Sequence, residues 1–334
     1  MIRNPVEPLT DDVSDDPVLV LLTAAQLRES LLSEVALGLQ ATPKELSPKW
    51  LYDDYGCELF GRITELTQYY PTRAERSILQ NHAANIQRLS LATTLIELGS
   101  GTSEKTRLVL NAFDATQSLE QFVAFDVAEP TLRDAVGKIQ ADFPETKVQG
   151  IVGDFTQHLS ALPVGGVRMI VFLGGTIGNF PGPQRNKFLA EVAQSLQPGD
   201  SLLLGTDLIK DRSRLVAAYD DTDGVTAAFN KNLLSVLNTE LRGEFDLDLF
   251  RHVALFNEAD SCIEMRLRSV TDQQIALGDL GLLIEFSAGE DLLTEISTKF
   301  SEQQVQDELQ AAGFSTQHCW KDDAGDFALW LAMR

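Results

Sequence analysis

The chain has 334 residues, of which 44% are hydrophobic, and its mean hydropathy is −0.06. A chain of this length exceeds one ordinary hydrophobic core, so we expect two lobes. No apolar run reaches the roughly 18 residues of a membrane-spanning helix, and the first residues lack the apolar segment of a secretory signal. These features predict a soluble, cytoplasmic protein that does not associate with membranes.

The charge balance and the cysteines narrow the range of partners. The chain carries 27 Lys and Arg against 49 Asp and Glu, a net charge of −22, which would repel nucleic acid. Cys57, Cys262 and Cys319 lie far apart and form no CxxC pair, which argues against a disulfide framework and against zinc. We therefore expect a small-molecule substrate, no nucleic-acid partner and no metal. The oligomeric state stays open, and a monomer is compatible with the sequence.

The N-terminal part of the chain is predicted to be an arm followed by helices. Residues 1–20, rich in Asp, Pro and Val, are predicted to form a flexible arm. From Thr23 to Leu39 apolar residues recur at helical spacing, and residues 49–70 form a helical, aromatic-rich segment after a proline break.

From residue 93 onward, short apolar runs alternate with helical stretches. Such alternation predicts a parallel sheet with helices on both faces. The expected strands are 93–99, 121–127, 147–155, 168–175 and 200–208.

After Leu208 this alternation stops. Residues 214–241 have a helical pattern, and three segments that follow are candidates for long strands. This change of pattern indicates an inserted α+β unit. The three strand candidates are 260–270, 275–286 and 291–300.

The C-terminal segment resumes the first pattern. Ser301 and Gln304 predict a capping box at the start of a helix that ends at Gly313. The apolar runs 316–322 and 327–333, separated by a turn, predict an antiparallel hairpin.

This layout is that of the class I methyltransferases, a Rossmann-like α/β fold. Its sheet has seven mostly parallel strands and ends in an antiparallel hairpin, and here an α+β substrate-binding lobe is inserted. We assign 74–209 and 300–334 to the S-adenosylmethionine-binding domain, and 21–73 and 210–299 to the substrate lobe.

The first strand of the sheet ends in a glycine-rich turn. Glu97, Gly99 and Gly101 lie where the strand passes into a helix, and small residues there let a ligand approach the backbone. A dinucleotide fingerprint would have a third glycine at position 104, but Glu104 places a negative charge there. The turn therefore disfavours a nicotinamide cofactor.

The next two strands end in carboxylates. Asp126 is suited to binding ribose hydroxyls, Asp154 to accepting from the adenine amino group, and Phe155 to contacting the ring. Each could instead be a helix cap or a core residue. Because parallel strands end at one edge of a sheet, their joint position favours an adenosyl group without phosphates. Lys105 is either a solvated helix charge or a partner for the methionyl carboxylate.

Several long segments carry a more specific signal than the glycine turn. They contain aromatic, acidic and amide residues in runs without gaps. These segments are YDDYGCELFGRITELTQYYPTRAE (52–75), ELGSGTSEKTR (97–107), GGTIGNF (174–180), GTDLIKD (205–211), AYDDTDGVTAAFN (218–230) and LLTEISTKF (292–300).

These motifs resemble those of the histidine-specific N-α-methyltransferases of ergothioneine biosynthesis, and the resemblance covers nearly the whole chain from about residue 45. It implies an enzyme that uses S-adenosyl-L-methionine to trimethylate the α-amino group of L-histidine, through the mono- and dimethylated forms. The implied product is hercynine, and the implied step is the first of ergothioneine biosynthesis.

The resemblance also implies which residues contact each reactant. To the cofactor residues derived above it adds Tyr52, and Tyr52 or a bound water is the candidate acceptor of the amine proton. The implied cofactor contacts are Tyr52, Gly99, Lys105, Asp126, Asp154 and Phe155.

On the substrate side, the resemblance divides the residues between the two ends of the amino acid. The amine and carboxylate would contact Tyr69, Gly174, Asn179 and Tyr219, and the imidazole would contact Met265, Glu295 and Ser297. An imidazole has two nitrogens, so a carboxylate and a hydroxyl together can bind both.

Other interpretations of these residues stay open at this stage. Glu295 and Ser297 could be the solvent face of an amphipathic strand, Asn179 a turn residue, and the tyrosines packing residues. The alternative functions are methylation of another amino acid or imidazole amine, a non-catalytic cofactor-binding module, and a nicotinamide oxidoreductase. No role is assigned to His82, His158, His252 or His318.

Overall fold

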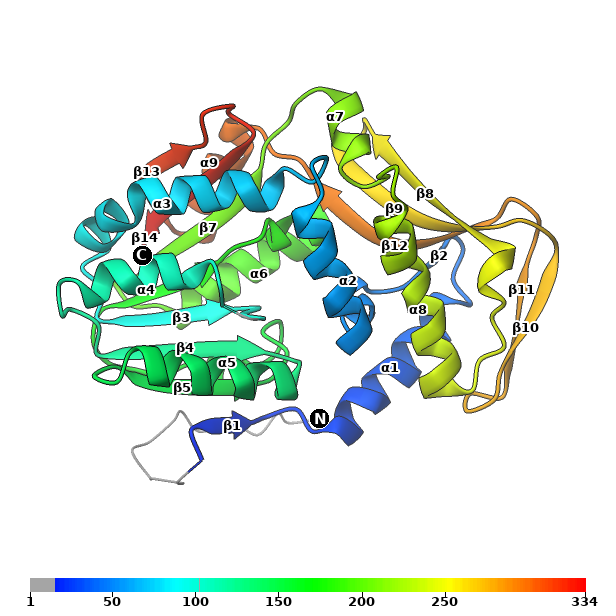
Figure 1. Ribbon diagram of the computed structural model, residues 1–334, viewed down its shortest axis with the longest axis horizontal. Coiled ribbons are helices and arrows are strands. Elements are labelled where there is room, and N and C mark those ends of the chain that lie inside the picture. Colours follow the sequence, from blue (N-terminus) through cyan, green and yellow to red (C-terminus); the bar gives the residue numbers. More distant parts are fainter. Residues whose placement is uncertain (1–15, 102) are drawn as a thin grey trace.

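The computed structural model describes residues 16–101 and 103–334. Its largest element is an eight-stranded sheet with the order β1-β5-β4-β3-β6-β7-β14-β13 (Figure 1). The strands from β1 to β7 in this order are parallel, and β14 is antiparallel to both β7 and β13. Their bounds are β1 (Val18–Val20), β3 (Thr94–Leu98), β4 (Gln121–Asp126), β5 (Lys147–Val152), β6 (Arg168–Phe172), β7 (Ser201–Asp207), β13 (Ser315–Lys321) and β14 (Phe327–Met333).

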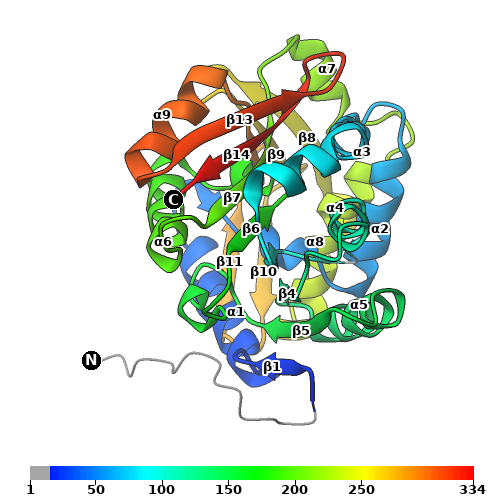
Figure 2. The ribbon, with the colours of Figure 1, turned by 90° about the vertical axis from the view of Figure 1, so that its left-hand side faces the viewer.

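This topology confirms the predicted class I methyltransferase sheet, including its terminal hairpin. Residues of β3 and β7 are all buried, which explains why these strands are continuous apolar runs in the sequence. Helices cover both faces of the sheet, as Figure 2 shows from the side. One face packs against α3 (Pro71–Ser90), α4 (Thr106–Asp114) and α5 (Glu129–Asp142), and the other against α6 (Gly182–Ser195) and α9 (Glu302–Ala312).

The N-terminal arm differs from its prediction at its last residues. Val18–Val20 form β1 and extend the sheet beyond β5, where Val18 pairs with Gly150 and is buried. A methyl group added at Gly150 would approach the Val18 side chain to 3.1 Å, so a residue without a side chain allows the two strands to pack. The rest of the predicted arm, residues 1–15, lies outside the described part of the chain.

A second lobe is built from two segments, one before the first strand of the main sheet that follows α3 and one inserted between β7 and α9. Its four-stranded sheet has the order β2-β12-β9-β8, and the side chains of residues 31–70 and 215–292 share one hydrophobic core. The sheet strands are β2 (Lys44–Glu45), β8 (Phe250–Asn257), β9 (Cys262–Ser269) and β12 (Asp291–Thr298). The helices are α1 (Ala24–Gly38), α2 (Asp54–Glu65), α7 (Arg212–Ala217) and α8 (Val225–Leu241), with 3-10 turns η1 (Pro48–Leu51), η2 (Leu159–Ala161), η3 (Thr176–Asn179) and η4 (Leu247–Leu249) in the chain.

Two strand predictions in this lobe were wrong or incomplete. The segment 275–286 is not one strand but a hairpin of β10 (Gln273–Leu277) and β11 (Leu282–Phe286), and its turn includes Gly281 at φ +62°. The sequence interpretation also omitted β8, most of whose residues are only partly buried and therefore lack a strong apolar pattern.

The C-terminal helix begins and ends where it was predicted. The Ser301 hydroxyl accepts from the N–H of Gln304 at 3.2 Å, and Gly313 ends the helix at φ +95°. The reciprocal half of the capping box is missing among the described contacts, because the Gln304 side chain donates to Glu308 instead.

The two lobes are joined where β7 leaves the main sheet. Leu208 and Phe300 form a parallel bridge, and the N–H of Phe300 donates to the carbonyl of Asp207 at 2.9 Å. The carboxyl ends of β7 and β12 therefore lie side by side.

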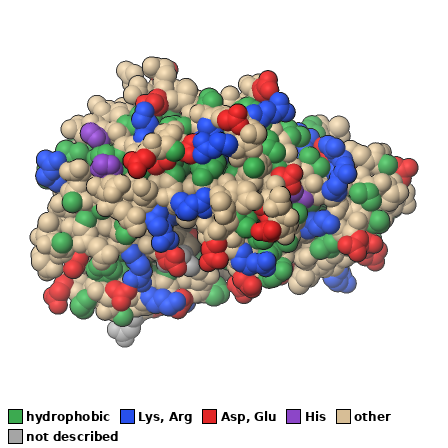
Figure 3. Space-filling view, turned by 45° about the horizontal axis from the view of Figure 1, so that its top comes forward, with side chains coloured by type: hydrophobic (Ala, Val, Ile, Leu, Met, Phe, Trp, Pro, Cys, Tyr) green, Lys and Arg blue, Asp and Glu red, His purple; other side chains and the backbone are tan. Residues whose placement is uncertain are grey.

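None of the described helices is both long and apolar enough to cross a bilayer. On the face shown in Figure 3, basic and acidic side chains are intermixed.

Candidate active site

The glycine turn after β3 closes against the end of β4. Gly99 has φ +68°, in the region that favours glycine, and its N–H donates to the carbonyl of Phe125 at 2.8 Å. The Asp126 carboxylate accepts from the N–H of Gly101 at 2.8 Å and from that of Ala128 at 3.0 Å. Asp126 therefore fixes the shape of the turn at the carboxyl edge of the sheet.

Ser100, in the same turn, was missed by the sequence interpretation. Its hydroxyl is buried and finds no hydrogen-bond partner within residues 16–101 and 103–334. Unpaired buried polar groups are rare and costly, so this hydroxyl is a candidate contact for a ligand atom. Its neighbour Glu97 is satisfied internally by Ser103 and Thr106, and burial raises the pKa of Glu97 to about 7.

The end of β5 provides a polar and an aromatic group. Asp154 accepts from the backbone and hydroxyl of Thr156 and from the side chain of Gln157. Burial acts to raise the pKa of Asp154, but these hydrogen bonds and the charge of Lys49, 3.9 Å away, lower it below its usual value. Phe155 packs its ring 5.5 Å from that of Phe172.

A cavity of about 210 Å³ opens beside Asp154. Val127, at the end of β4, lines it together with Lys49 and side chains of α1 such as Gln26. The second lobe therefore closes one side of the space next to the strand ends, which the sequence interpretation did not foresee.

Lys105 has a partner that the sequence did not reveal. Its ammonium pairs with Glu75 of α3, whose side chain is fully buried. The Glu75 carboxylate also accepts from the N–H of Gly174 at 2.9 Å. Glu75 therefore links the predicted cofactor residue Lys105 to the predicted substrate residue Gly174.

The imidazole residues predicted on β9 and β12 lie together. Glu295 pairs directly with Met265 across the two strands, and a bulge separates Leu293 from Glu295. Glu295 and Ser297 are 9% and 7% exposed. The alternative in which both lie on a solvent-exposed strand face is therefore wrong.

The buried environment of Glu295 shifts its pKa. Burial raises its pKa to about 7, against a hydrogen bond from Asn179 and the charge of Lys299. Asn179, in η3, also donates its side-chain N–H to the carbonyl of Ile296 at 2.9 Å. Asn179 is thus fixed against β12 and is not a free turn residue.

Three tyrosines surround the same region. Tyr69 and Tyr219 are buried with ring centroids 6.1 Å apart, whereas Tyr52 is 37% exposed and contacts Phe229 at 5.3 Å. Although part of Tyr52 is exposed, its phenol group is buried like those of Tyr69 and Tyr219. Burial raises the pKa of each phenol well above its usual value, and the charge of Glu295 contributes to all three shifts. Tyr52, Tyr69 and Tyr219 therefore lie within electrostatic reach of the buried carboxyl group of Glu295.

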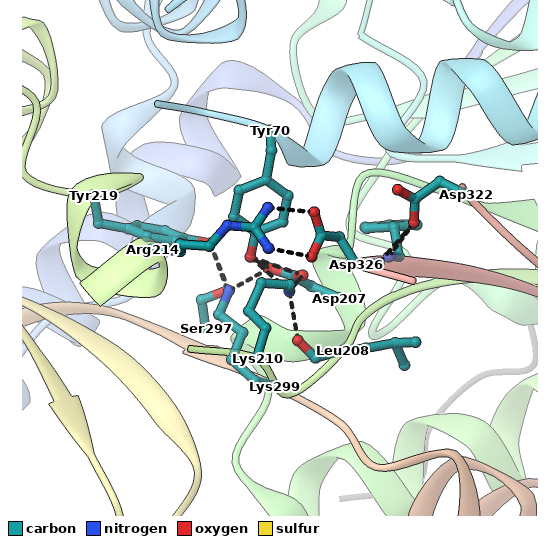
Figure 4. Close-up of polar contacts among 11 residues, drawn as sticks. Tyr70, Asp207, Leu208, Lys210, Arg214, Tyr219, Ser297, Lys299, Asp322 and Asp326 are labelled. Carbon is teal, nitrogen blue, oxygen red and sulfur yellow. Dashed lines mark hydrogen bonds and ion pairs between the residues drawn. The ribbon is translucent and has the colours of Figure 1, made fainter. Parts of the chain in front are cut away.

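A buried charged network lies behind these residues (Figure 4). Asp207, at the end of β7, accepts from the hydroxyl of Tyr70 at 2.8 Å, from Lys299 at 2.8 Å and from Lys210. Lys299 also donates to the hydroxyls of Tyr219 and Ser297. The sequence interpretation missed this network, although Asp207 ends a strand just as Asp126 and Asp154 do.

Two of the four histidines contact predicted site residues. A ring nitrogen of His252 lies 2.8 Å from the carbonyl of Tyr219, and a ring nitrogen of His158 accepts from the N–H of Asp154 at 3.1 Å. His252 and His158 therefore have hydrogen-bonding roles in the structure, although neither belongs to a sequence motif.

Comparison with known proteins identifies the class of this site. The family model of histidine-specific, S-adenosylmethionine-dependent methyltransferases matches residues 31–334. The chain is 50% identical over 313 residues to the histidine N-alpha-methyltransferase of Mycolicibacterium smegmatis, covering 94% of this chain and 98% of that one. It is 51% identical over 306 residues to the protein of the same name from Mycobacterium tuberculosis, with coverages of 91% and 95%. Ergothioneine biosynthesis protein 1 of Schizosaccharomyces pombe is 29% identical over 317 residues, covering 91% of this chain and 40% of that protein. The chain therefore belongs to the family of histidine-specific, S-adenosylmethionine-dependent methyltransferases.

Proposed function

We propose that the chain transfers methyl groups from S-adenosyl-L-methionine to the α-amino nitrogen of L-histidine until the nitrogen is quaternary, which makes it the first enzyme of ergothioneine biosynthesis. The observation that carries this proposal is the buried pair Glu295 and Ser297, two residues apart on β12. A carboxylate and a hydroxyl can bind both nitrogens of an imidazole, whereas an apolar ring would leave them unpaired. A site with unpaired buried polar groups rejects such a substrate.

The residues at the strand ends fit the proposed cofactor. The carboxylates of Asp126 and Asp154 match ribose hydroxyls and an adenine amino group, and the unpaired hydroxyl of Ser100 offers a further polar contact. The absence of a side chain at Gly99 lets a ligand approach the backbone, with Phe155 3.6 Å from where a methyl group would lie. S-Adenosyl-L-methionine, when bound, supplies a methyl group on a positively charged sulfur.

The substrate amine must lose a proton before it can attack. The raised pKa of Tyr52 keeps its hydroxyl protonated near neutral pH, so a resting phenolate is not the base. We propose that the Tyr52 oxygen accepts the amine proton while its own proton passes to a water molecule. This relay leaves no charge on the phenol.

The other end of the amino acid is assigned to Asn179, Tyr219 and the backbone of Gly174. Their proposed role is to hold the carboxylate and amine so that the nitrogen keeps its alignment in each round, a contribution of proximity and orientation. In each round the nitrogen would lose one proton and form one N–CH₃ bond. The methyl–sulfur bond of the bound cofactor would break, and its electron pair would remain on the sulfur of S-adenosylhomocysteine. After the third transfer the nitrogen has no lone pair, so the reaction stops.

We further propose that segments 21–73 and 210–299 form the substrate-binding lobe, because Glu295, Met265 and Tyr219 belong to its core or its sheet. All the proposed contacts come from one chain, which is compatible with a monomer acting in the cytoplasm.

Mass spectrometry of L-histidine incubated with the protein and S-adenosyl-L-methionine tests the proposal. We expect mono-, di- and trimethylated histidine in succession, with no further product. Intact cofactor binding without any methylated histidine would favour a non-catalytic module. Methylation of another amino acid but not of histidine would favour the rival with a changed substrate.

A further inference from the structure

Lys299 is a fully buried lysine, two residues beyond Ser297 at the end of β12. Its ammonium donates to Oδ2 of Asp207 at 2.8 Å, to the hydroxyl of Tyr219 at 2.9 Å and to the hydroxyl of Ser297 at 2.8 Å (Figure 4). An ammonium has three N–H donors, so these contacts use all of them. Lys299 therefore has no donor left for a substrate and acts through its neighbours.

The hydroxyls of Tyr219 and Ser297 also bond to each other, with their oxygens 2.8 Å apart. Each oxygen already accepts a hydrogen from Lys299, so neither can be left without a donor. The pair holds two hydroxyl hydrogens, and one of them lies between the two oxygens. The other hydrogen must point away from the pair.

We propose that Lys299 is a positioning residue that makes the Tyr219–Ser297 pair present one hydroxyl hydrogen to the bound amino acid. The pair then recognises a hydrogen-bond acceptor on the substrate, either a carboxylate oxygen or the unprotonated nitrogen of the imidazole. This inference rests on the proposed function, since the acceptor is taken to belong to histidine. Without the ammonium, a lone pair on each hydroxyl is released and the pair no longer has a fixed polarity.

Asp207 keeps other partners when Lys299 is replaced. The hydroxyl of Tyr70 and the ammonium of Lys210 both donate to the same carboxylate. The Lys299→Met substitution therefore does not leave an unpaired buried charge on Asp207. Lys210→Met is a matched control, because it removes an ammonium from Asp207 while the contacts of Lys299 with the two hydroxyls are untouched.

The test is histidine binding, measured by calorimetry on protein saturated with S-adenosylhomocysteine. We expect Lys299→Met to weaken histidine roughly ten- to a hundredfold, in line with loss of hydrogen bonds to a charged group. The affinity for S-adenosylhomocysteine should change less than about twofold, and Lys210→Met should weaken histidine much less than Lys299→Met. In kinetics, KM for histidine should rise more than kcat falls.

A double-mutant cycle of Lys299 and Tyr219 shows whether Lys299 acts on histidine binding through the Tyr219 hydroxyl or only by filling space. Tyr219→Phe should cost less affinity in the Lys299→Met background than in the wild type, because the two residues act as one unit. Lys299→Gln, which keeps two neutral donors, should recover part of the loss and provides the same cycle if the methionine variant fails to fold.

If Lys299→Met and Tyr219→Phe weaken histidine binding by factors that simply multiply in the double variant, the inference is wrong. It is also wrong if Lys299→Met and Lys210→Met weaken histidine binding equally. Failure of the proposed function gives a different result. In that case, wild-type protein would bind S-adenosylhomocysteine but not histidine.

Discussion

The two ends of the site are built in different ways. At the proposed cofactor end, Gly99, Asp126 and Asp154 lie at or just beyond the ends of adjacent strands. The two carboxylates there are bonded mostly by nearby backbone and hydroxyl groups. At the proposed substrate end, Asn179 and Glu295 come from segments more than a hundred residues apart and pack against each other. The first end follows from local strand and turn geometry, and the second requires the packing of the two lobes.

The electrostatics differ in the same way. The pKa of Asp154 is lowered by local hydrogen bonds, whereas that of Glu295 is raised by burial. A buried charge is stable only when it is paired, and Lys299 and Asp207 provide such a pair behind the substrate residues. We therefore expect changes at the cofactor end to affect one ligand, and changes at the substrate end to affect affinity, selectivity and pH dependence together.

The largest effect is expected at the cofactor end, from Asp126→Ala. This change removes the proposed ribose acceptor and also the acceptor for Gly101, so affinity for S-adenosylmethionine should fall more than about a hundredfold. The sheet is untouched, so the circular dichroism spectrum should be that of the wild type. Unchanged affinity in calorimetry would show that Asp126 only shapes the turn, and Asp126→Asn serves as a control that keeps one oxygen acceptor.

Next in size is the effect of Glu295→Ala on the choice of side chain. The imidazole loses its charged partner, so histidine affinity should fall roughly ten- to a hundredfold. Without the buried carboxyl, the pocket should tolerate the ring of tryptophan better. The measurement is kcat/KM for both amino acids in wild type and variant. If their ratio does not move toward tryptophan, Glu295 does not determine specificity.

A smaller effect is expected on the pH dependence of stability. Because burial raises the pKa of Glu295 from 4.5 to about 7, the folded protein binds this proton more tightly than the unfolded chain. The contribution of Glu295 is therefore most favourable below pH 4.5 and is lost as the pH rises through about 7, by about 3 kcal/mol. Denaturant unfolding of Glu295→Gln without ligands should lack this decline. An identical pH slope in variant and wild type would mean that the pKa of Glu295 is not raised.

The smallest of these effects is expected for Asn179→Ala, which should weaken histidine about three- to tenfold through loss of a neutral hydrogen bond. Affinity for S-adenosylmethionine should stay within about twofold of the wild type, because the side chain contacts β12 and not the strand ends that carry the cofactor residues. Titrations with each ligand measure both values. Equal losses for the two would assign Asn179 a structural role between the lobes and would weaken the distinction between the two ends of the site.

Sequence patterns were enough to predict the main sheet, its terminal hairpin and the carboxylates at or just beyond the strand ends. The physical reason is local: hydrophobic periodicity reports strands and helices, and parallel strands bring their carboxyl ends to one edge. The inserted lobe was recognised by a change of pattern, and its motifs located Glu295 and Ser297. The partly buried strand β8 and the short strand β1 carried too little apolar pattern to be predicted.

Which side chains are buried together became clear only from the packing of the folded chain. Glu295 and Ser297 have the spacing of any exposed strand face, and their burial depends on packing of the second sheet. The contact of Lys299 with Asp207 joins residues that are 92 positions apart, and that of Lys105 with Glu75 joins residues 30 apart. Periodicity along the chain cannot report such pairs. Lys299 and Asp207 meet because the two lobes pack together, whereas Lys105 and Glu75 meet because two helices pack on one face of the main sheet. Both contacts also depend on the free energy of pairing charges away from water.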